Sequence, residues 1–230
     1  MTGRGDLGSG EAGRSARRES ERIRKRRLEH APASGWARLL ATLYGPSAQE
    51  RQMIARERRW ATGARGEELV AESLVRRCPS IPLLHDRAMP GSRANIDHIA
   101  ISASGVYVID AKRYRGKIEV REPLFGSPTL RIAGRNQTKL IDGLGKQIAV
   151  VEAALAEVAP KVPVHGCFCF VAPEGRFAGS GLPVIRTLSI SGYPLYYPRR
   201  LAKKINRPGP LMPEQASRIH AELAQRLPPA

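Results

Sequence analysis

One segment, residues 95–117, constrains the fold of this chain more than any other. Its sequence, NIDHIAISASGVYVIDAKRYRGK, predicts two strands joined by a tight turn. Asp97 opens the first strand, and Asp110 and Lys112 end the second. Because side chains alternate between the two faces of a strand, Asp110 and Lys112 point the same way, among apolar neighbours. A carboxylate beside an amine at the edge of an apolar strand suits a divalent metal next to a phosphate better than it suits a core.

The chain carries a large excess of positive charge. Its 230 residues include 38 Lys and Arg against 21 Asp and Glu, which gives a net charge of +17. The excess is found in the first 60 residues and also in the remainder, so a basic tail alone does not explain it. This balance favours polyanionic partners, either nucleic acid or an anionic membrane surface.

The cysteines and the apolar runs indicate a reducing compartment. Cys167 and Cys169 lie in the apolar run HGCFCFV, where buried thiols are expected rather than a disulfide or a zinc site. No basic region is followed by the apolar stretch of a signal peptide, and no apolar run approaches the length of a membrane span. We therefore expect a cytoplasmic protein.

The order of the expected elements predicts an α/β fold. A long helix is followed by a group of strands, a second helix and further strands, and two basic amphipathic helices close the chain. The expected ranges are 47–77 for the first helix, 81–87 for a strand, 117–121 and 129–132 for a hairpin, 137–158 for the second helix, 164–172 and 182–189 for strands, and 198–205 and 213–227 for the last helices. Together these elements predict a central mixed sheet flanked by helices.

The chain divides into a basic arm over residues 1–45, a main domain over residues 46–190 and a basic helical extension over residues 191–230. Within the arm, residues 1–18 are rich in Gly, Arg and Ser and are expected to be disordered. Residues 19–30 contain helix formers without an apolar face, and we expect them to become helical against a partner. An apolar stripe over residues 36–44 fits docking on the main domain better than contact with a membrane.

The acidic residues and Lys112 have the chemistry that phosphodiester hydrolysis needs. Metal ions held by carboxylates can supply a nucleophilic water, stabilise charge on the phosphoryl group and assist the leaving oxygen. Asp97 and Asp110 offer the oxygen ligands that Mg²⁺ prefers, and Lys112 can orient water or stabilise developing charge. A third carboxylate, Glu67, is expected from the preceding helix, which two glycines allow to approach the sheet.

The combined pattern resembles the nuclease-related domain, or NERD. The motifs are G-x-x-G-E at residues 63–67, N-I-D-H at residues 95–98, S-G-V-Y-V-I-D-A-K at residues 104–112 and R-G-K-I at residues 115–118. They extend over under half of the chain, in line with a common domain size. The family looks like a branch of the PD-(D/E)xK nuclease superfamily, and the resemblance implies a restriction-endonuclease-like core.

The resemblance also implies roles for individual residues. It assigns Glu67, Asp97 and Asp110 to the binding of Mg²⁺ or Mn²⁺, and Lys112 to catalysis. A glutamine recurs in the following helix of related nucleases, and Gln147 is the candidate in this chain. Asp110 stands where many members have Glu, so the pocket around a metal would be slightly tighter. Structure-selective nucleases of this superfamily often look dimeric, and a homodimer is one expected assembly.

Basic residues near these acids are candidates for nucleic-acid contacts. Arg113, Arg115 and Lys117 follow the second strand directly, and Arg87 and Arg93 flank the loop that enters the first. Such contacts position phosphates and make binding salt-dependent without reading sequence. No helix-turn-helix or zinc-finger pattern is present, so we expect a preference for the structure of DNA over its sequence.

Each acidic residue also has a simpler interpretation. Asp97 fits the cap of a turn, and Asp110 with Lys112 fits a surface ion pair worth about 0–1 kcal/mol. Glu68 also lies near the border of the apolar face of the first helix, next to the expected ligand from that helix. His98 faces the opposite side of the strand from Asp97, and we expect it to pack or to form a hydrogen bond rather than to bind a metal.

Three functions are compatible with the sequence. The first is a metal-dependent nuclease that acts on phosphodiester bonds of DNA. The second is a non-catalytic module that retains a nuclease-like fold and binds DNA or another polyanion. The third is a membrane-peripheral protein that uses its basic arm on anionic lipid. The complete set of acids and lysine favours the nuclease, because carboxylates repel DNA unless a metal lies between them.

Overall fold

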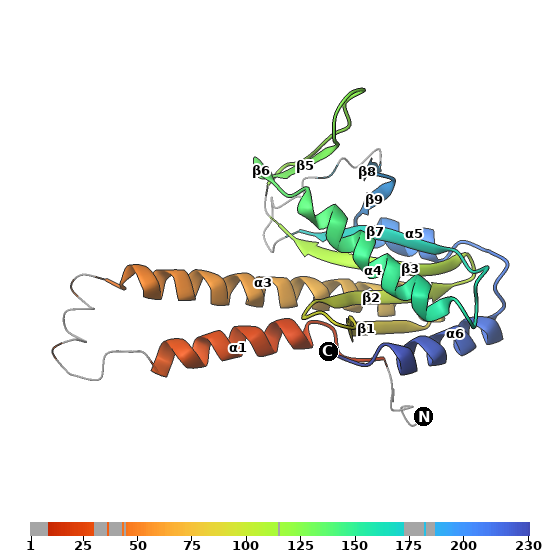
Figure 1. Ribbon diagram of the computed structural model, residues 1–230, viewed down its shortest axis with the longest axis horizontal. Helices are drawn as coiled ribbons and strands as arrows, with labels where there is room; N and C mark the ends of the chain where they lie inside the picture. Colours follow the sequence, from red (N-terminus) through yellow and green to blue (C-terminus); the bar gives the residue numbers. More distant parts are fainter. Residues whose placement is uncertain are drawn as a thin grey trace.

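The core of the protein is a six-stranded mixed sheet (Figure 1). The computed structural model describes residues 9–29, 36, 43, 45–114, 116–172, 182 and 187–230. The strands follow the order β1-β2-β3-β7-β9-β8, with the bounds β1 (Leu83–Ala88), β2 (Asn95–Ser102), β3 (Gly105–Arg113), β7 (Val164–Val171), β8 (Leu188–Ile190) and β9 (Tyr193–Tyr196). Neighbours among β1, β2 and β3 are antiparallel, whereas β7 runs parallel to both β3 and β9. The expected mixed sheet is confirmed.

Strands β2 and β3 supply the acidic residues of the sheet. Both strands are rich in Ile and Val, and most of their residues are buried because helices cover the two faces. The turn between them is tight: Ser102 pairs with Gly105, whose φ of +130° costs glycine little. The pairing sets His98 opposite Ile109, and this register brings the acidic residues of both strands to the same end of the sheet.

Helices cover both faces of the sheet (Figure 1). On one face lie α3 (Ala48–Arg77) and α5 (Pro198–Ile205), and on the other lie α4 (Lys139–Leu155) and α6 (Pro213–Arg226). Each face has its own cluster of buried apolar side chains, a larger one beneath α4 and α6 and a smaller one beneath α3 and α5. The result is the helix–sheet–helix layering that the order of elements predicts.

Helix α3 begins where the sequence predicts. The side chain of Ser47 caps it by accepting a hydrogen bond from the N–H of Glu50. Val70 and Leu74 are fully buried against the sheet, as the helical period requires. Val75 is 58% exposed, because it lies one residue beyond the buried stripe.

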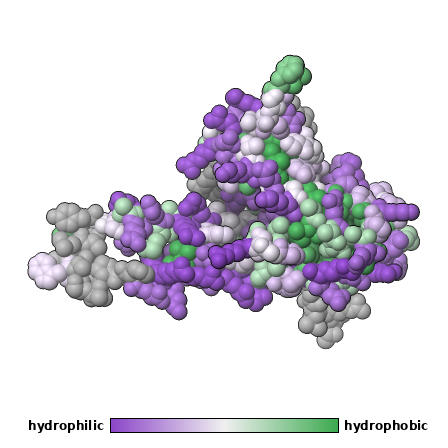
Figure 2. All heavy atoms as spheres, viewed as in Figure 1, coloured by the Kyte–Doolittle hydropathy of each residue, from purple (hydrophilic) through white to green (hydrophobic). Residues whose placement is uncertain are grey.

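A second, three-stranded sheet stands at the edge of the core (Figure 1). It consists of β4 (Ile118–Arg121), β5 (Thr129–Ile132) and β6 (Arg135–Asn136), and its first two strands form the expected hairpin. Apolar side chains of both β4 and β5 join the larger core cluster. The tip of the hairpin is solvent-exposed, and its apolar side chains form the projection coloured green in Figure 2.

The N-terminal arm is ordered earlier than the sequence predicts. Helix α1 (Arg14–Glu29) begins within the stretch that composition marks as disordered, and it lies along α3 (Figure 1). Ser15 donates from its N–H (2.6 Å) and its hydroxyl (2.7 Å) to the carboxylate of Asp86 on β1. Ala16 and Ile23 are buried. The expectation of disorder is wrong for residues 9–18, because this chain's own α3 and β1 supply the partner that the arm needs.

The apolar stripe over residues 36–44 lies largely outside the described residues. Its two described members, Trp36 and Leu43, are 77% and 70% exposed. For these two side chains, the expected docking on the main domain is wrong. Each is a single exposed apolar residue, and nothing in the described part of the chain covers it.

The last forty residues are integrated with the core. β9 extends the main sheet beside β7, and α5 and α6 each bury apolar side chains against it. Ile205 and Leu223 are fully buried. The sheet thus continues beyond residue 190, where composition alone suggests that a helical extension begins.

The described helices are too polar to cross a membrane. Helix α3 has 30 residues, but Arg and Glu occur along its whole length. Within the described ranges, no helix combines the length and the apolar character of a bilayer span.

Arg87 links the first strand to the end of the last helix. Its side chain is fully buried, and its guanidinium donates hydrogen bonds to the carbonyl oxygens of Leu227 (2.5 Å) and Ala224 (2.7 Å). These carbonyls belong to the C-terminal turn of α6, where the helix itself supplies no donors. Arg87 therefore has a structural role, and its interpretation as a nucleic-acid contact is wrong.

Replacing Arg87 is expected to destabilise the protein far more than replacing Arg93, the exposed arginine of the following loop. Arg87→Met removes two hydrogen bonds from a charged donor and leaves buried carbonyls unpaired, a loss of about 2–4 kcal/mol in the free energy of unfolding. Arg93→Met should stay within about 0.5 kcal/mol of wild type. Urea denaturation measures both, and equal small effects would contradict this role for Arg87.

Candidate active site

The strand register brings Asp97, Asp110 and Lys112 together. Lys112 forms an ion pair with the carboxylate of Asp110 two residues earlier on β3. On β2, Asp97 Oδ2 accepts a hydrogen bond from the N–H of Ala111 at 2.8 Å. Both carboxylates are buried, whereas the side chain of Lys112 is 20% exposed. The ion pair of Asp110 with Lys112 is therefore largely buried, unlike the surface ion pair that the sequence also allowed.

Helix α3 approaches this end of the sheet closely because of one glycine. A Cβ atom on Gly66 would lie 2.9 Å from the Cβ of Arg113 on β3, so any larger residue would push the helix away. Gly63, one turn earlier, has open space around it. The expectation that glycines let the helix approach is therefore confirmed for Gly66 and wrong for Gly63.

The same approach turns Glu67 toward the site. Glu67 is buried, and its carboxylate interacts electrostatically with Lys112 and Asp110. Glu68 points away and pairs with Arg17 of α1 and with Arg65. The helix phase thus separates two neighbouring acids that the sequence leaves open, and Glu67 is the one that faces the sheet.

Burial and mutual repulsion raise the proton affinity of two of the acids. Removal from water raises the pKa of Glu67 to about 7, and Asp86 and Asp110 add to this, while Lys112 opposes it. Burial also raises the pKa of Asp97 well above its usual value, with Glu67 as the next cause. At pH values at which an exposed carboxylate is ionised, Glu67 and Asp97 therefore still tend to hold a proton. A cation placed among these groups would offset both the cost of burial and the repulsion between the carboxylates.

Lys112 is held in its charged form. Burial alone would lower its pKa, but the carboxylates of Asp110 and Asp97 outweigh burial and raise it. The ammonium group is consequently a fixed positive charge at neutral pH. It can stabilise negative charge or donate a hydrogen bond, but it is not suited to accept a proton.

Among the described residues, two side-chain oxygens are buried without a hydrogen bond. Glu67 Oε2 is one, and Oε1 of Gln147 on α4 is the other. Gln147 lies on α4, which packs on the sheet face to which Val106 and Val108 of β3 contribute. Buried oxygens in proteins are nearly always paired, so these two mark positions where a water, a cation or a substrate group would bind.

The described residues contain no ready-made cage for a metal. Within these ranges, no three His, Cys, Asp or Glu side chains are arranged so that they could hold an ion together. The oxygens present are nevertheless of the kind that Mg²⁺ selects, namely carboxylates, and Mg²⁺ in proteins usually keeps several waters as ligands. Lys112 contacts Asp110, so this ion pair has to loosen before both oxygens of Asp110 can reach a cation.

Asp86 is a member of the site that sequence analysis missed. It is buried on β1 in the left-handed region at φ +49°, an uncommon conformation for a residue other than glycine. Its carboxylate accepts hydrogen bonds from Ser15 and, at 2.6 Å, from the side chain of Asn95. It also contributes to the raised pKa of Glu67. The signal available in the sequence was an acidic residue, Asp86, within the expected strand over residues 81–87.

The two buried histidines form a pair of their own. The Nδ1 atoms of His85 and His98 lie 2.8 Å apart, and the rings meet edge to face. Burial lowers the pKa of His98 well below its usual value, with His85 as the next cause, so His98 is neutral at pH 7. The expectation that His98 packs and forms a hydrogen bond is confirmed.

The five basic candidates for nucleic-acid contacts lie in different surroundings. Arg113 is half-buried beside Gly66, and Lys117 is exposed and pairs with Glu119 at 3.0 Å. Arg93 is exposed and lines a groove between α1, α3 and the start of β2. Arg115 lies outside the described residues. Of the five, only the buried Arg87 is excluded from contact with phosphate.

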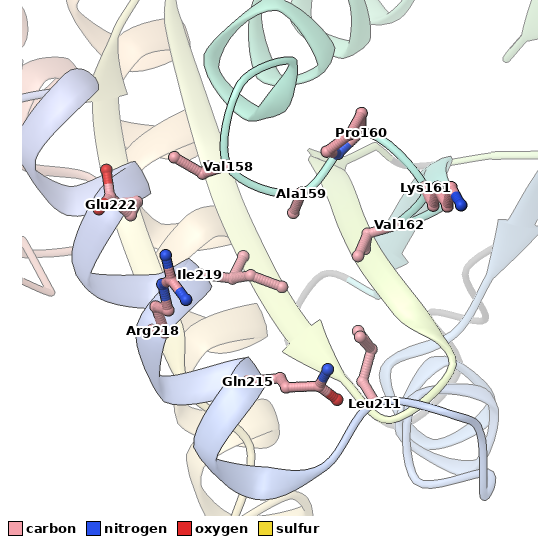
Figure 3. A pocket seen from close by; sticks show the side chains of 10 residues that line it. All are labelled: Val158, Ala159, Pro160, Lys161, Val162, Leu211, Gln215, Arg218, Ile219 and Glu222. Carbon is pink, nitrogen blue, oxygen red and sulfur yellow. The ribbon is translucent and has the colours of Figure 1, made fainter.

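An apolar pocket lies elsewhere and has different chemistry (Figure 3). Its volume is about 260 Å³, and its walls come from the loop after α4 and from α6, with Val162, Leu211 and Ile219 pointing into it. This loop leads into β7 at the end where β7 pairs with the start of β3. Asp110 and Lys112 lie toward the other end of β3, so the pocket is separate from the site.

One of the comparisons with known proteins found a match. Residues 62–171 match the family model of the nuclease-related domain, which spans Glu67, both aspartates, Lys112 and Gln147. The resemblance seen in the sequence is therefore confirmed over this stretch. No curated protein and no solved structure matches the chain. The match covers just under half of the chain, and over these residues the protein is similar to the nuclease-related domain.

Glu67→Gln is expected to flatten the pH dependence of stability between pH 4.5 and about 7. Across this range the folded protein retains a proton on Glu67 that the unfolded chain releases, because the pKa rises from 4.5 to about 7 on folding. The folded state binds more protons there, so stability falls as pH rises and the loss is complete above about pH 7. Thermal unfolding across this range measures the profile.

The matched control for this pH profile is Asp142→Asn, a change at an exposed acid of α4. It should leave the wild-type profile unchanged. Parallel profiles for wild type and Glu67→Gln would contradict the raised pKa of Glu67 and its placement among the other carboxylates.

Proposed function

We propose that this protein is a Mg²⁺-dependent nuclease that hydrolyses phosphodiester bonds of DNA. The observation that carries the proposal is the buried ion pair of Lys112 with Asp110, beside Asp97, whose carboxylate accepts a hydrogen bond from Ala111 N–H. Glu67 is buried on α3 and interacts electrostatically with Lys112 and Asp110. These residues come from α3, β2 and β3, and all of them lie within residues 62–171, the stretch that matches the nuclease-related domain.

The charges of the site support a cation as its missing partner. Buried carboxylates that repel one another are costly unless they are protonated or paired with positive charge. Lys112 is one cation for three acids, and Glu67 Oε2 lacks a hydrogen bond. A divalent ion among Glu67, Asp97 and Asp110 would complete the balance, and Mn²⁺ suits the same oxygen ligands. When bound, such an ion stabilises charge on the phosphoryl group and lowers the pKa of a water molecule.

Each side chain of the cluster has a role in this proposal. The three carboxylates bind the cation, and the hydrogen bond from Ala111 N–H holds Asp97 in place. Lys112 places a permanent positive charge beside the phosphate, where negative charge grows in the transition state. Gln147 offers a buried oxygen that can orient a water or a ligand. Asp86, bonded to Ser15 and Asn95, positions the neighbourhood of Glu67 without facing the substrate directly.

A pure binding module fits the same site less well. Phosphates are attracted by Lys and Arg, and three buried acids at the centre of a phosphate-binding surface would oppose the attraction. The acids are useful to the protein only if a cation separates them from the substrate. Metal dependence is thus the property that distinguishes a nuclease from a module that only recruits DNA.

Cleavage of plasmid, linear and branched DNA should occur with Mg²⁺ or Mn²⁺ and stop in EDTA. Asp110→Asn and Lys112→Met should each lower the rate by about 100-fold or more, because the first weakens a ligand of the cation and the second removes the positive charge beside the phosphate. Agarose gels and a fluorescent junction substrate measure the rates. Asp142→Asn and Lys161→Met, which change exposed residues of the same types, should retain wild-type rates.

Two outcomes would contradict the proposal. If the wild type binds DNA but cuts none of these substrates with either metal, the protein is a binding module. If cleavage persists in EDTA or in both site variants, hydrolysis arises elsewhere or from a contaminant.

A further inference from the structure

A basic groove lies beside the candidate site, between α1, α3 and the start of β2. Its volume is about 750 Å³. Five arginines line it, three from α1, one from α3 and one from the β1–β2 loop: Arg18, Arg22, Arg26, Arg56 and Arg93. All five are exposed at the surface. Such a density of guanidinium groups in one hollow is costly without an anion to balance it.

The three arginines of α1 form a regular row. Arg18, Arg22 and Arg26 follow one another at intervals of four residues, which places them on one face of the helix. Each step rises about 6 Å, so the row extends about 12 Å. A nucleic-acid strand carries one phosphate per nucleotide at regular intervals, so a row of this length can contact more than one phosphate of the same strand. A linear polyanion matches the row better than a small anion does.

The groove contains one acid, Glu19, which limits its charge. Glu19 pairs with Arg22 at 2.8 Å and with Arg56 at 3.6 Å. The contact between Glu19 and Arg56 bridges α1 and α3, the two walls of the groove. Five arginines against one glutamate leave the hollow strongly positive. A ligand that brings several negative charges would displace water from the walls without breaking the α1–α3 packing.

Trp60 supplies an aromatic surface within the same groove. Its side chain is 41% exposed, although Trp is usually buried. Arg56 lies one helical turn earlier on α3, so a cation and a ring are presented together. Alternating positive charge and aromatic rings is the pattern that binds single-stranded nucleic acid, since phosphates contact the charges and bases stack on the ring. In a duplex the bases are stacked internally and would not reach Trp60.

The groove leads toward the site. Asn95 lines it, opens β2 and donates its side-chain hydrogen bond to Asp86. Asp97 follows two residues later on the same strand. We infer that the groove binds a single-stranded segment of nucleic acid, with its phosphates on the α1 row and a base on Trp60, and directs that strand to the acids. The direction of the strand toward cleavage rests on the proposed function, whereas binding in the groove does not.

Binding is tested by fluorescence of Trp60 in EDTA, where no cleavage can occur. The chain has two tryptophans, so Trp36→Phe leaves Trp60 as the only reporter. Oligothymidylate should quench this fluorescence to saturation, and a duplex of equal length should bind at least about tenfold more weakly. Trp60→Ala, measured by anisotropy of labelled oligothymidylate, should bind about tenfold more weakly than wild type, because a stacked base is lost.

The role of the arginine row is tested by two matched double variants. Arg18→Gln with Arg22→Gln removes two charges from the row, and Arg24→Gln with Lys25→Gln removes two from other exposed positions of the same helix. The first should lower affinity at least about tenfold at low salt and reduce the slope of log affinity against log salt by about 1.4. The second should change the slope by less than half of that amount. Glu19→Gln should tighten binding.

The outcomes separate this inference from the proposed function. If the two double variants have equal effects, or if oligothymidylate does not quench Trp60, the groove is not a binding site for single-stranded nucleic acid, even if the protein cuts DNA. Saturable quenching with the expected difference between the double variants supports the groove even if the protein cuts nothing. Circular dichroism of every variant confirms that α1 is folded, so loss of binding is not loss of structure.

Discussion

Buried charge at one end of the central sheet is the constraint on which this structure depends. Asp97 and Asp110 are placed by the pairing of β2 with β3, and Lys112 neutralises only part of their charge. Glu67 joins them because α3 approaches the sheet at Gly66. Burial of so many ionisable groups costs stability, and natural proteins retain such costs mainly at functional sites. The fold around the cluster is what keeps it from relaxing into solvent.

Most of the fold could be predicted from the sequence because its signals are local. The period of apolar residues predicted α3, and the apolar runs predicted β2, β3 and β7 to within a few residues. The arm could not be predicted in this way, because α1 has almost no apolar face and is held by Ser15 on Asp86 and by ion pairs with α3. Such contacts join residues far apart in the chain, and composition carries no signal for them.

The candidate site was predictable as a set of residue types, while its geometry was not. Strand alternation and the family motifs predicted Asp97, Asp110 and Lys112, and the helix phase in the structure selects Glu67 over Glu68. Arg87 looked like a surface cation, but burial shows it to be a cap for α6. Asp86 and the groove arginines of α1 and α3 escaped prediction because they matter only where β1, α1 and α3 meet, whereas Arg93 was already a candidate.

The most direct test of this account is a crystal structure of the protein soaked in Mn²⁺, with anomalous scattering measured to locate the ion. The account predicts a manganese peak coordinated by Glu67, Asp97 and Asp110, with the Lys112 ammonium displaced from its ion pair with Asp110. A crystal that shows the ion pair intact and no manganese among these carboxylates would contradict the central claim that the cluster is a metal site.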